Sequence, residues 1–276
     1  MKSVFVINDN TVEAQHVAES ALMMAKTINA KLIIGNRLIK SSKPALSFAF
    51  PHPEVLEEDT YGDDTLLRRL NLLNATIKGE LTDIEEVDIS SMDSHRLSAF
   101  INANNVTLLM ISTETVKAVS GRKLIDYQTV LNKISAPIFL VPASWSFKKF
   151  RSITYITDLR YCRTDVLSYL TKVTLPFKTS IYVGHMAASG LPDLSPDFAR
   201  QLFYEAARRC THWEHLNFHH IPSKDISTVA DVLIHGMSND ALVLINHSQH
   251  YHYFIGKQLM LNQPELVNVP LLLYPN

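Results

Sequence analysis

Two stretches decide the fold of this chain: Ser-Val-Phe-Val-Ile-Asn-Asp at residues 3–9 and Ser-Ile-Thr-Tyr-Ile-Thr-Asp at residues 152–158. Each is a short apolar run that ends in an acid. Each is followed by a helix-like pattern, a second apolar run and, much later, an apolar run that contains proline. The late runs are residues 136–142 and 269–275. An internal repeat of this length predicts two copies of one domain.

The first 35 residues predict a β-α-β unit. Residues 3–8 are mostly apolar on both faces, as in a buried parallel strand. Asn10 can cap the helix that follows, with Glu13 as its capping-box partner. Residues 31–35 form the second strand, so the unit implies a parallel sheet with a right-handed crossover.

The same order of elements continues through both halves. Residues 41–64 contain three prolines and an acidic run, and we interpret them as an excursion from the regular fold that leads into a helix. The apolar patterns predict further strands near residues 81–89, 107–111, 137–141, 180–183, 241–245 and 270–274. Helical spacing predicts helices near residues 64–78, 94–103, 127–134, 166–173, 197–210 and 226–236.

Bulk composition narrows the class of protein. The 276 residues suffice for about two domains of ordinary size, and no apolar run approaches the roughly 20 residues of a membrane span. The N-terminus does not read as a signal peptide. The net charge of −1 gives no reason to expect a nucleic-acid partner. Two cysteines, Cys162 and Cys210, make no disulfide framework, so we expect a cytoplasmic protein with neither nucleic-acid nor membrane partners.

The order of these elements, in duplicate, resembles the universal stress protein family. Val-Ile-Asn-Asp at 6–9 and Tyr-Ile-Thr-Asp at 155–158 look like the Val-Pro-Thr-Asp strand end of that family. Ala-Pro at 136–137 and Val-Pro at 269–270 look like the start of its last strand. The resemblance covers almost the whole chain. It implies two tandem α/β domains, each with a doubly wound, parallel, five-stranded sheet of the Rossmann-like, adenine nucleotide alpha hydrolase type.

The resemblance also implies how the two copies pack. We place the domains at residues 1–143 and 144–276. In the family, the final strands of two domains pair edge to edge. The corresponding strands here, residues 138–141 and 271–274, can pair within one chain and so cover both exposed edges. We therefore expect an intramolecular pseudo-dimer, with which a homodimer of whole chains is compatible.

Asp9 and Asp158 are the first candidate site residues. Ligands of doubly wound sheets lie beyond the carboxyl ends of the strands, at the switch in strand order. The resemblance places both acids there. The alternative is that each acid only caps the following helix or bonds to local backbone. The residues alone leave both interpretations open.

The phosphate-binding motif of the ATP-binding members is missing. That motif is G-x-x-G-(x9)-G-[S/T] after the fourth strand, and its glycines let backbone N–H groups approach the phosphates. In the first half its positions fall on Ile111, Glu114, Leu124 and Ile125. In the second half only Gly256 lies near the pattern. Family-type ATP binding is therefore doubtful in both copies, and the second is the better candidate for a retained site.

A polar loop in the second half supplies the other candidate ligand residues. It follows the fourth strand of that half. The expected ligand-binding residues are Asp158, Asn246, His247, Ser248, Gly256 and Lys257, with Asp9 in the first half. ATP or AMP with magnesium is the alternative ligand.

Three histidines of the same loop suggest a metal module as a further alternative. These are His247, His250 and His252. Imidazole suits zinc, nickel or copper. However, no ordered set of cysteine or carboxylate partners accompanies them, and zinc requires a definite shell of four ligands. We therefore expect no metal.

These observations favour a stress-response protein that is not an enzyme. It would bind a small ligand or a protein partner, without a cofactor. No G-x-S-x-G nucleophile elbow is present, and Cys162 has no identified base. Two alternatives stay open: a nucleotide-binding protein with an altered phosphate loop and weak ATP hydrolysis, and a metal-binding module.

Overall fold

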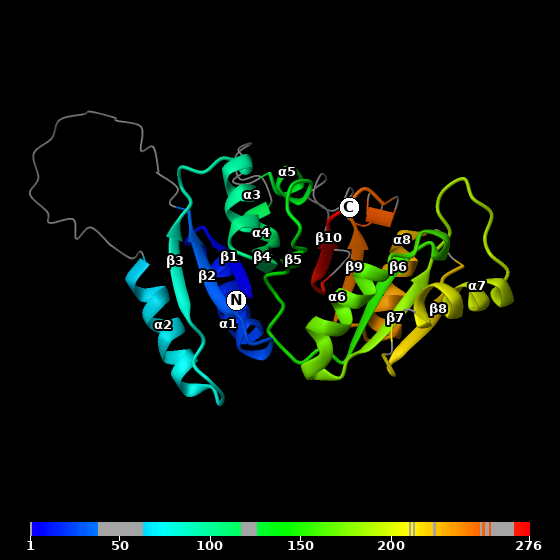
Figure 1. Ribbon diagram of the computed structural model, residues 1–276, viewed down its shortest axis with the longest axis horizontal. Coiled ribbons are helices and arrows are strands. Elements are labelled where there is room, and N and C mark those ends of the chain that lie inside the picture. Colours follow the sequence, from blue (N-terminus) through cyan, green and yellow to red (C-terminus); the bar gives the residue numbers. More distant parts are fainter. Residues whose placement is uncertain are drawn as a thin grey trace, which may run out of the picture.

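The computed structural model describes residues 2–37, 63–116, 126–209, 211, 213–222, 225–248, 250–251, 254 and 268–276 (Figure 1). Most of the predicted excursion at 41–64 lies outside the described residues, as do Gly256, Lys257 and His252. None of the described helices combines the length and the apolar character that a membrane span requires.

The first half of the chain runs from β1 to β5. The initial unit follows the prediction, with β1 (Ser3–Asn8), α1 (Val12–Thr27) and β2 (Lys31–Asn36). The cap of α1 differs from the prediction. Asn10 adopts a left-handed conformation with φ of 63°, which asparagine tolerates, and the Thr11 side chain accepts the capping hydrogen bond from the Ala14 amide. The remaining elements are α2 (Asp63–Thr76), β3 (Ile84–Asp88), α3 (Ser94–Ala103), β4 (Val106–Ser112), α4 (Thr113–Val116), α5 (Tyr127–Leu131) and β5 (Ile138–Val141).

The second half runs from β6 to β10 and repeats this order. It begins with β6 (Ser152–Thr157), η1 (Leu159–Tyr161), α6 (Thr164–Thr174), η2 (Leu175–Phe177) and β7 (Ser180–His185). It continues with α7 (Pro196–Phe203), η3 (Tyr204–Arg208), β8 (Leu216–His220), α8 (Ile226–Asp231), η4 (Val232–Gly236), β9 (Ala241–Ile245) and β10 (Leu271–Tyr274). Two predicted helices, near 197–210 and 226–236, each end in a π-helical turn, η3 and η4.

The described strands form one ten-stranded sheet. Its order is β3-β2-β1-β4-β5-β10-β9-β6-β7-β8. All neighbours are parallel except β5 and β10, which pair in antiparallel fashion with Leu271 opposite Leu140. The two final strands therefore pair with each other as expected, at the centre of the sheet (Figure 1). This order is compatible with two fused five-stranded domains.

The first two strands of each half pair in the same register. Ser3 pairs with Lys31, and Ser152 pairs with Ser180, so the same number of residues separates the partners in each half. A glycine occupies the same place in both second strands, Gly35 beside Ile7 and Gly184 beside Ile156. The repeat seen in the sequence is thus also a repeat of strand pairing.

Helices cover both faces of the sheet. One apolar core contains side chains of α1, α2, α6 and α7, and the other contains side chains of α3, α5 and α8. Each core draws residues from both halves, for example Val6 and Val183 in the first and Ile7 and Leu244 in the second. The doubly wound arrangement follows, since right-handed crossovers on either side of the starting strand place helices on opposite faces.

The segment between the halves is packed against the sheet. Trp145 and Phe150 are buried, and their rings stack with centroids 6.1 Å apart. Phe139 of β5 contacts both rings in T-shaped, edge-to-face arrangements. Phe147 and Phe177 complete this aromatic cluster. The connection is therefore a fixed part of the core.

Candidate functional site

A cavity of about 710 Å³ lies at the carboxyl ends of β6 and β9. In the strand order, β6 stands between β9 and β7. The next strands in the sequence, β7 and β8, are added on one side of β6, whereas β9 and β10 are added on the other side, so the strand order switches at β6. Ligands of doubly wound sheets bind at such a switch. The described residues that line the cavity are Thr157, Asp158, Tyr161, Cys162, Arg163, Ala188, Ser189, Leu191, Ile245, Asn246, His247, Ser248, His250 and Asn276.

Asp158 follows β6 directly, and its side chain is 1% exposed. The carboxylate accepts hydrogen bonds from the Arg160 guanidinium at 2.6 and 2.8 Å, from the Arg160 amide at 3.0 Å and from the Ala188 amide at 2.9 Å. Burial opposes ionisation, but these hydrogen bonds outweigh it, so the pKa of Asp158 lies below its ordinary value. The group is a carboxylate whose oxygens already have partners.

These bonds fix one wall of the cavity. The Ala188 amide binds Asp158, and the Arg160 guanidinium also donates to the Pro192 carbonyl at 3.2 Å. The Met186 amide donates to Thr157. The segment between β7 and α7 is thereby tied to the end of β6. Of the two interpretations of Asp158, local bonding describes the observed contacts, although the side chain still lines the cavity.

Asn246, His247 and Ser248 form the opposite wall, directly after β9. His247 has a φ of 58°, which turns the chain sharply. Asn246 Nδ2 donates to Asn132 Oδ1 at 2.6 Å, and His247 Nε2 lies 2.8 Å from the same oxygen. Ser248 Oγ accepts from the Tyr251 amide. Asn246 Oδ1 is buried and has no hydrogen-bond partner.

Asn132 belongs to the first half, where it ends α5. Its contact with Asn246 and His247 follows from the antiparallel pairing of β5 and β10. That pairing brings the amino end of β5 to the same edge as the carboxyl ends of the second-half strands. The first half thus supports the site of the second.

His250 is buried and donates from Nε2 to the Met186 carbonyl at 2.9 Å. Burial lowers its pKa, and this effect outweighs the opposing influence of that carbonyl and of Asp158. The alternative metal set is not brought together among the described residues, because His247 and His250 point to different partners, Asn132 and Met186. The third member, His252, lies outside the described residues.

Asp9 lies apart from this cavity. Its Oδ1 accepts from the Thr11 amide and hydroxyl, at 3.1 and 2.6 Å. Its Oδ2 is buried without a hydrogen-bond partner. The glycine positions of the first half are filled by regular structure, since Ile111 lies within β4 and Glu114 within α4. Leu124 and Ile125 lie outside the described residues.

The structure adds lining residues that the sequence did not single out. Tyr161 and Arg163 enter from the segment after β6, and Ala188, Ser189 and Leu191 enter from the segment before α7. Arg163 pairs with Asp165 at 2.6 Å and donates to the Pro275 carbonyl. No local pattern marks these positions, because they depend on the path of loops. Four predicted residues, Asp158 and residues 246–248, do meet in one cavity.

Comparisons with known proteins bear on the fold. The sequence matches no family model and no curated protein. A universal stress protein from Archaeoglobus fulgidus DSM 4304 superposes with a TM-score of 0.56 at 11% identity, covering 99% of this chain and 98% of its own. A putative universal stress protein from Pseudomonas aeruginosa UCBPP-PA14 gives a TM-score of 0.51 at 11% identity, covering 99% and 92%. The chain therefore shares its fold with universal stress proteins.

Proposed function

We propose that this chain is a non-enzymatic binding protein that holds a small organic ligand in the cavity between β6 and β9. The observation that carries the proposal is the meeting of Asp158 with residues 246–248 at the switch point of the second half. Small-molecule sites prefer such places and typically enclose about 300–1,000 Å³. The cavity volume of about 710 Å³ falls within this range.

The described lining favours a neutral ligand. The lining contains one carboxylate, Asp158, and one guanidinium, Arg163. Each already forms an ion pair, Asp158 with Arg160 and Arg163 with Asp165. A phosphate would therefore meet few uncommitted cations among the described residues. Tyr161 is 63% exposed and offers an aromatic face, while the Ser248 hydroxyl, which accepts from the Tyr251 amide, can also donate a hydrogen bond. These groups suit a polar organic molecule with a planar part.

We further infer that the halves, residues 1–143 and 144–276, are two copies of one domain packed as a pseudo-dimer. The matching registers of β1–β2 and β6–β7 and the β5–β10 pairing support this inference. The likeness in fold to universal stress proteins supports a role in a cytoplasmic stress response. In this proposal the first half acts mainly as a scaffold.

A nucleotide is the second candidate ligand, because the switch point is where doubly wound sheets hold nucleotides. In that case Gly256 and Lys257, outside the described residues, would complete the site with Asp158. Binding of Mg-ATP would then depend on the Asp158 carboxylate. The two candidates differ in whether phosphate contributes to affinity.

Thermal unfolding distinguishes the candidates. The probes are a panel of neutral polar metabolites, Mg-ATP and AMP, each tested on the wild type, on Leu191→Trp, which fills the cavity, and on Leu175→Trp, an exposed control. A ligand at about 100 times its Kd adds about 2.7 kcal/mol and raises the Tm by several degrees. We expect a neutral metabolite to raise the Tm of the wild type and of Leu175→Trp only.

Other outcomes decide against this proposal. A shift with Mg-ATP that disappears in Asp158→Ala would favour the nucleotide candidate. A panel without any shift would contradict small-ligand binding and favour a protein partner. An assay of phosphate release from Mg-ATP should show no turnover above background, and turnover lost in Asp158→Ala would contradict the non-enzymatic assignment.

A further inference from the structure

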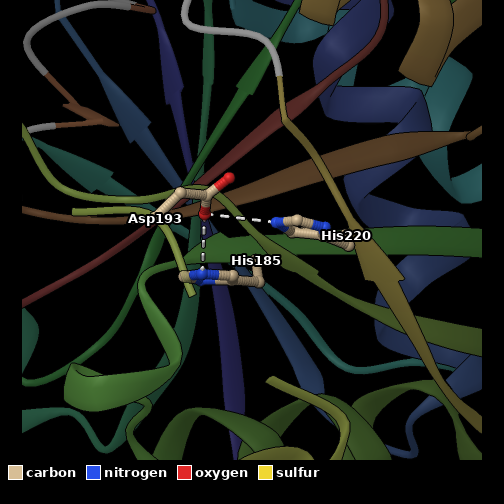
Figure 2. Close-up of side chains that lie close together, drawn as sticks. All are labelled: His185, Asp193 and His220. Atoms are coloured by element: carbon tan, nitrogen blue, oxygen red, sulfur yellow. Dashed lines mark hydrogen bonds and ion pairs between the residues drawn. The ribbon is translucent and has the colours of Figure 1, made fainter. Parts of the chain in front are cut away.

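Two histidines and an aspartate converge beside the candidate cavity (Figure 2). His185 ends β7, His220 ends the neighbouring strand β8, and Asp193 lies in the segment that joins β7 to α7. Asp193 Oδ1 is 3.5 Å from His185 Nε2 and 3.2 Å from His220 Nε2. The three potential ligand atoms all lie within 4.8 Å of one another.

His185 provides the strongest sign that this cluster serves a purpose. Its side chain is fully buried, and its Nε2 atom forms no hydrogen bond, because its contact with Asp193 Oδ1 is a long one of 3.5 Å. Nε2 points toward Asp193, and the His185 and His220 rings are parallel, with centroids 5.5 Å apart (Figure 2). A buried polar atom without a partner is costly and calls for an explanation. An ion between the three side chains would supply the missing partner.

We propose that His185 Nε2, His220 Nε2 and Asp193 bind a divalent transition-metal ion of the zinc type. Two imidazoles and a carboxylate are suitable ligands, and zinc accepts three protein ligands with a water in the fourth position. Zinc lies about 2.0–2.1 Å from each ligand atom, so ligand atoms of a tetrahedral site are about 3.3 Å apart. The contacts of 3.2 and 3.5 Å with Asp193 already match this spacing.

One existing contact must change when the metal binds. His185 Nδ1 accepts a hydrogen bond of 3.3 Å from the Leu159 amide, so the neutral ring carries its proton on Nε2. Metal binding at Nε2 requires the other neutral tautomer, in which the ring proton moves to Nδ1, so Nδ1 no longer accepts from the Leu159 amide. The buried Leu159 amide then faces a second donor, and a buried donor left without an acceptor lowers affinity by roughly 5- to 150-fold. Coordination by three side chains outweighs such a loss.

The proposal is independent of the ligand that fills the cavity. The metal would join the ends of β7 and β8 to Asp193 and so hold the segment before α7. Ala188, Ser189 and Leu191 of that segment line the cavity. The metal thus has a structural role next to the cavity, separate from the His247 loop.

The test is zinc affinity, measured with purified, chelator-treated full-length protein by competition with a zinc chelator of known affinity. The variants are Asp193→Asn, which keeps the shape of the side chain, and His220→Ala, on a partly exposed position. His219→Ala is the matched control, since His219 adjoins His220 on β8 but points to the other face. Circular dichroism and Tm in chelator verify that each variant folds.

We expect the wild type and His219→Ala to bind one zinc ion per chain, and magnesium to leave this binding unaffected. Asp193→Asn and His220→Ala should each raise the Kd by about 100-fold or more, since even an outer-shell partner contributes about 10- to 100-fold. Zinc binding that is absent, or equally tight in the wild type and in Asp193→Asn, would overturn the proposal. Binding lost in His247→Ala but kept in Asp193→Asn would also overturn it and assign the metal to the cavity loop.

Discussion

At the residue scale, two Arg–Asp pairs beside the cavity have the same geometry but different burial. Asp158 is 1% exposed, whereas Asp165 is 52% exposed, and each lies 2.6 Å from an arginine two positions away in the sequence. A buried pair that loses one charge leaves the other without compensation, while an exposed pair contributes little. The pair Asp158–Arg160 should therefore matter for stability, and the pair Arg163–Asp165 should not.

Asp158→Asn is expected to lower the free energy of unfolding by about 2–4 kcal/mol, because Arg160 and the Ala188 amide lose a charged acceptor. The matched variant Asp165→Asn should lower it by less than about 1 kcal/mol. Urea unfolding of both variants at neutral pH measures the difference. Equal losses would show that burial does not distinguish the two pairs.

The contacts of Asp240 predict how the free energy of unfolding depends on pH. Its buried carboxylate accepts from Lys148 at 2.7 Å and from the Arg151 and Ser152 amides. Burial raises the pKa of this carboxyl, but these hydrogen bonds lower it more, so the net pKa lies below its ordinary value. A lowered pKa in the folded state stabilises the fold above the ordinary carboxyl range near 4, and this contribution is lost as the pH falls through the folded-state pKa.

Asp240→Asn should therefore lower the free energy of unfolding by about 1–3 kcal/mol at pH 7. The difference from the wild type should shrink as the pH falls below about 4, because the unfolded chain takes up a proton there while the folded-state carboxylate, with its lowered pKa, is still ionised. Urea unfolding at pH 7, 5, 4 and 3 tests this. A difference that stays constant down to pH 3 would mean that the charge of Asp240 does not stabilise the fold.

At the scale of elements, the close packing of β2 depends on a glycine. A Cβ atom at Gly35 would lie 2.6 Å from Phe5 Cζ and 3.1 Å from Ile89 Cδ1. Phe5 is fully buried and contacts Phe100, so it has no room to move. Gly236, in η4, has its nearest such neighbour at 3.8 Å and therefore has room for a methyl group.

Gly35→Ala is expected to lower the free energy of unfolding by about 1–3 kcal/mol, because it overpacks the core between β1 and β2. Gly236→Ala should change it by less than about 1 kcal/mol in either direction. Chemical unfolding of the two variants provides the comparison. A neutral Gly35→Ala would show that the strands can separate locally at no cost.

The elements themselves follow from the sequence wherever local pattern decides them. The helix predicted near 94–103 is α3, and the repeated starts at residues 3 and 152 give β1 and β6. The prediction that Asn10 caps α1 was wrong. Asparagine is also suited to a left-handed turn, which Asn10 adopts, and the Thr11 side chain caps the helix instead. Pattern alone does not decide between two such neighbouring polar residues.

The residues of the candidate site can be divided in the same way, into those that the sequence predicts and those that it does not. Asp158 and residues 246–248 could be predicted, because parallel topology fixes where strands end and their carboxyl ends meet at one edge. Residues 188–191 and the approach of Asp193 to His185 could not, since they depend on a loop held by Arg160 and His220. The sequence does not mark His220 as part of a cluster, because its alignment with His185 depends on the register of β7 and β8.

At the scale of the whole molecule, the two halves share both apolar cores. Residues from either half contribute to each face of the sheet, and the aromatic cluster around Trp145 packs where they join. The antiparallel β5–β10 pair adds backbone hydrogen bonds at the same place. Neither half has a core that is closed off from the other.

Thermal unfolding is therefore expected to be one cooperative transition. In differential scanning calorimetry the ratio of calorimetric to van't Hoff enthalpy should be close to 1, as for a single unit. Phe139→Ala, which removes a buried ring from the junction, should lower the Tm while keeping one transition. Two resolved transitions in the wild type would show that the halves unfold independently.

The contact of Asn132 with residues 246 and 247 has a consequence for how such a chain can evolve. In a symmetric pair of identical subunits, every substitution changes both binding sites at once. In a single chain, a substitution in one half can change the binding site of the other half alone. Asn132 occupies such a position, since it belongs to the first half and hydrogen-bonds to Asn246 and His247, which line the cavity of the second half. If the halves are two copies of one domain, as proposed above, a substitution of Asn132 can alter the cavity of the second half without a matching change in the first.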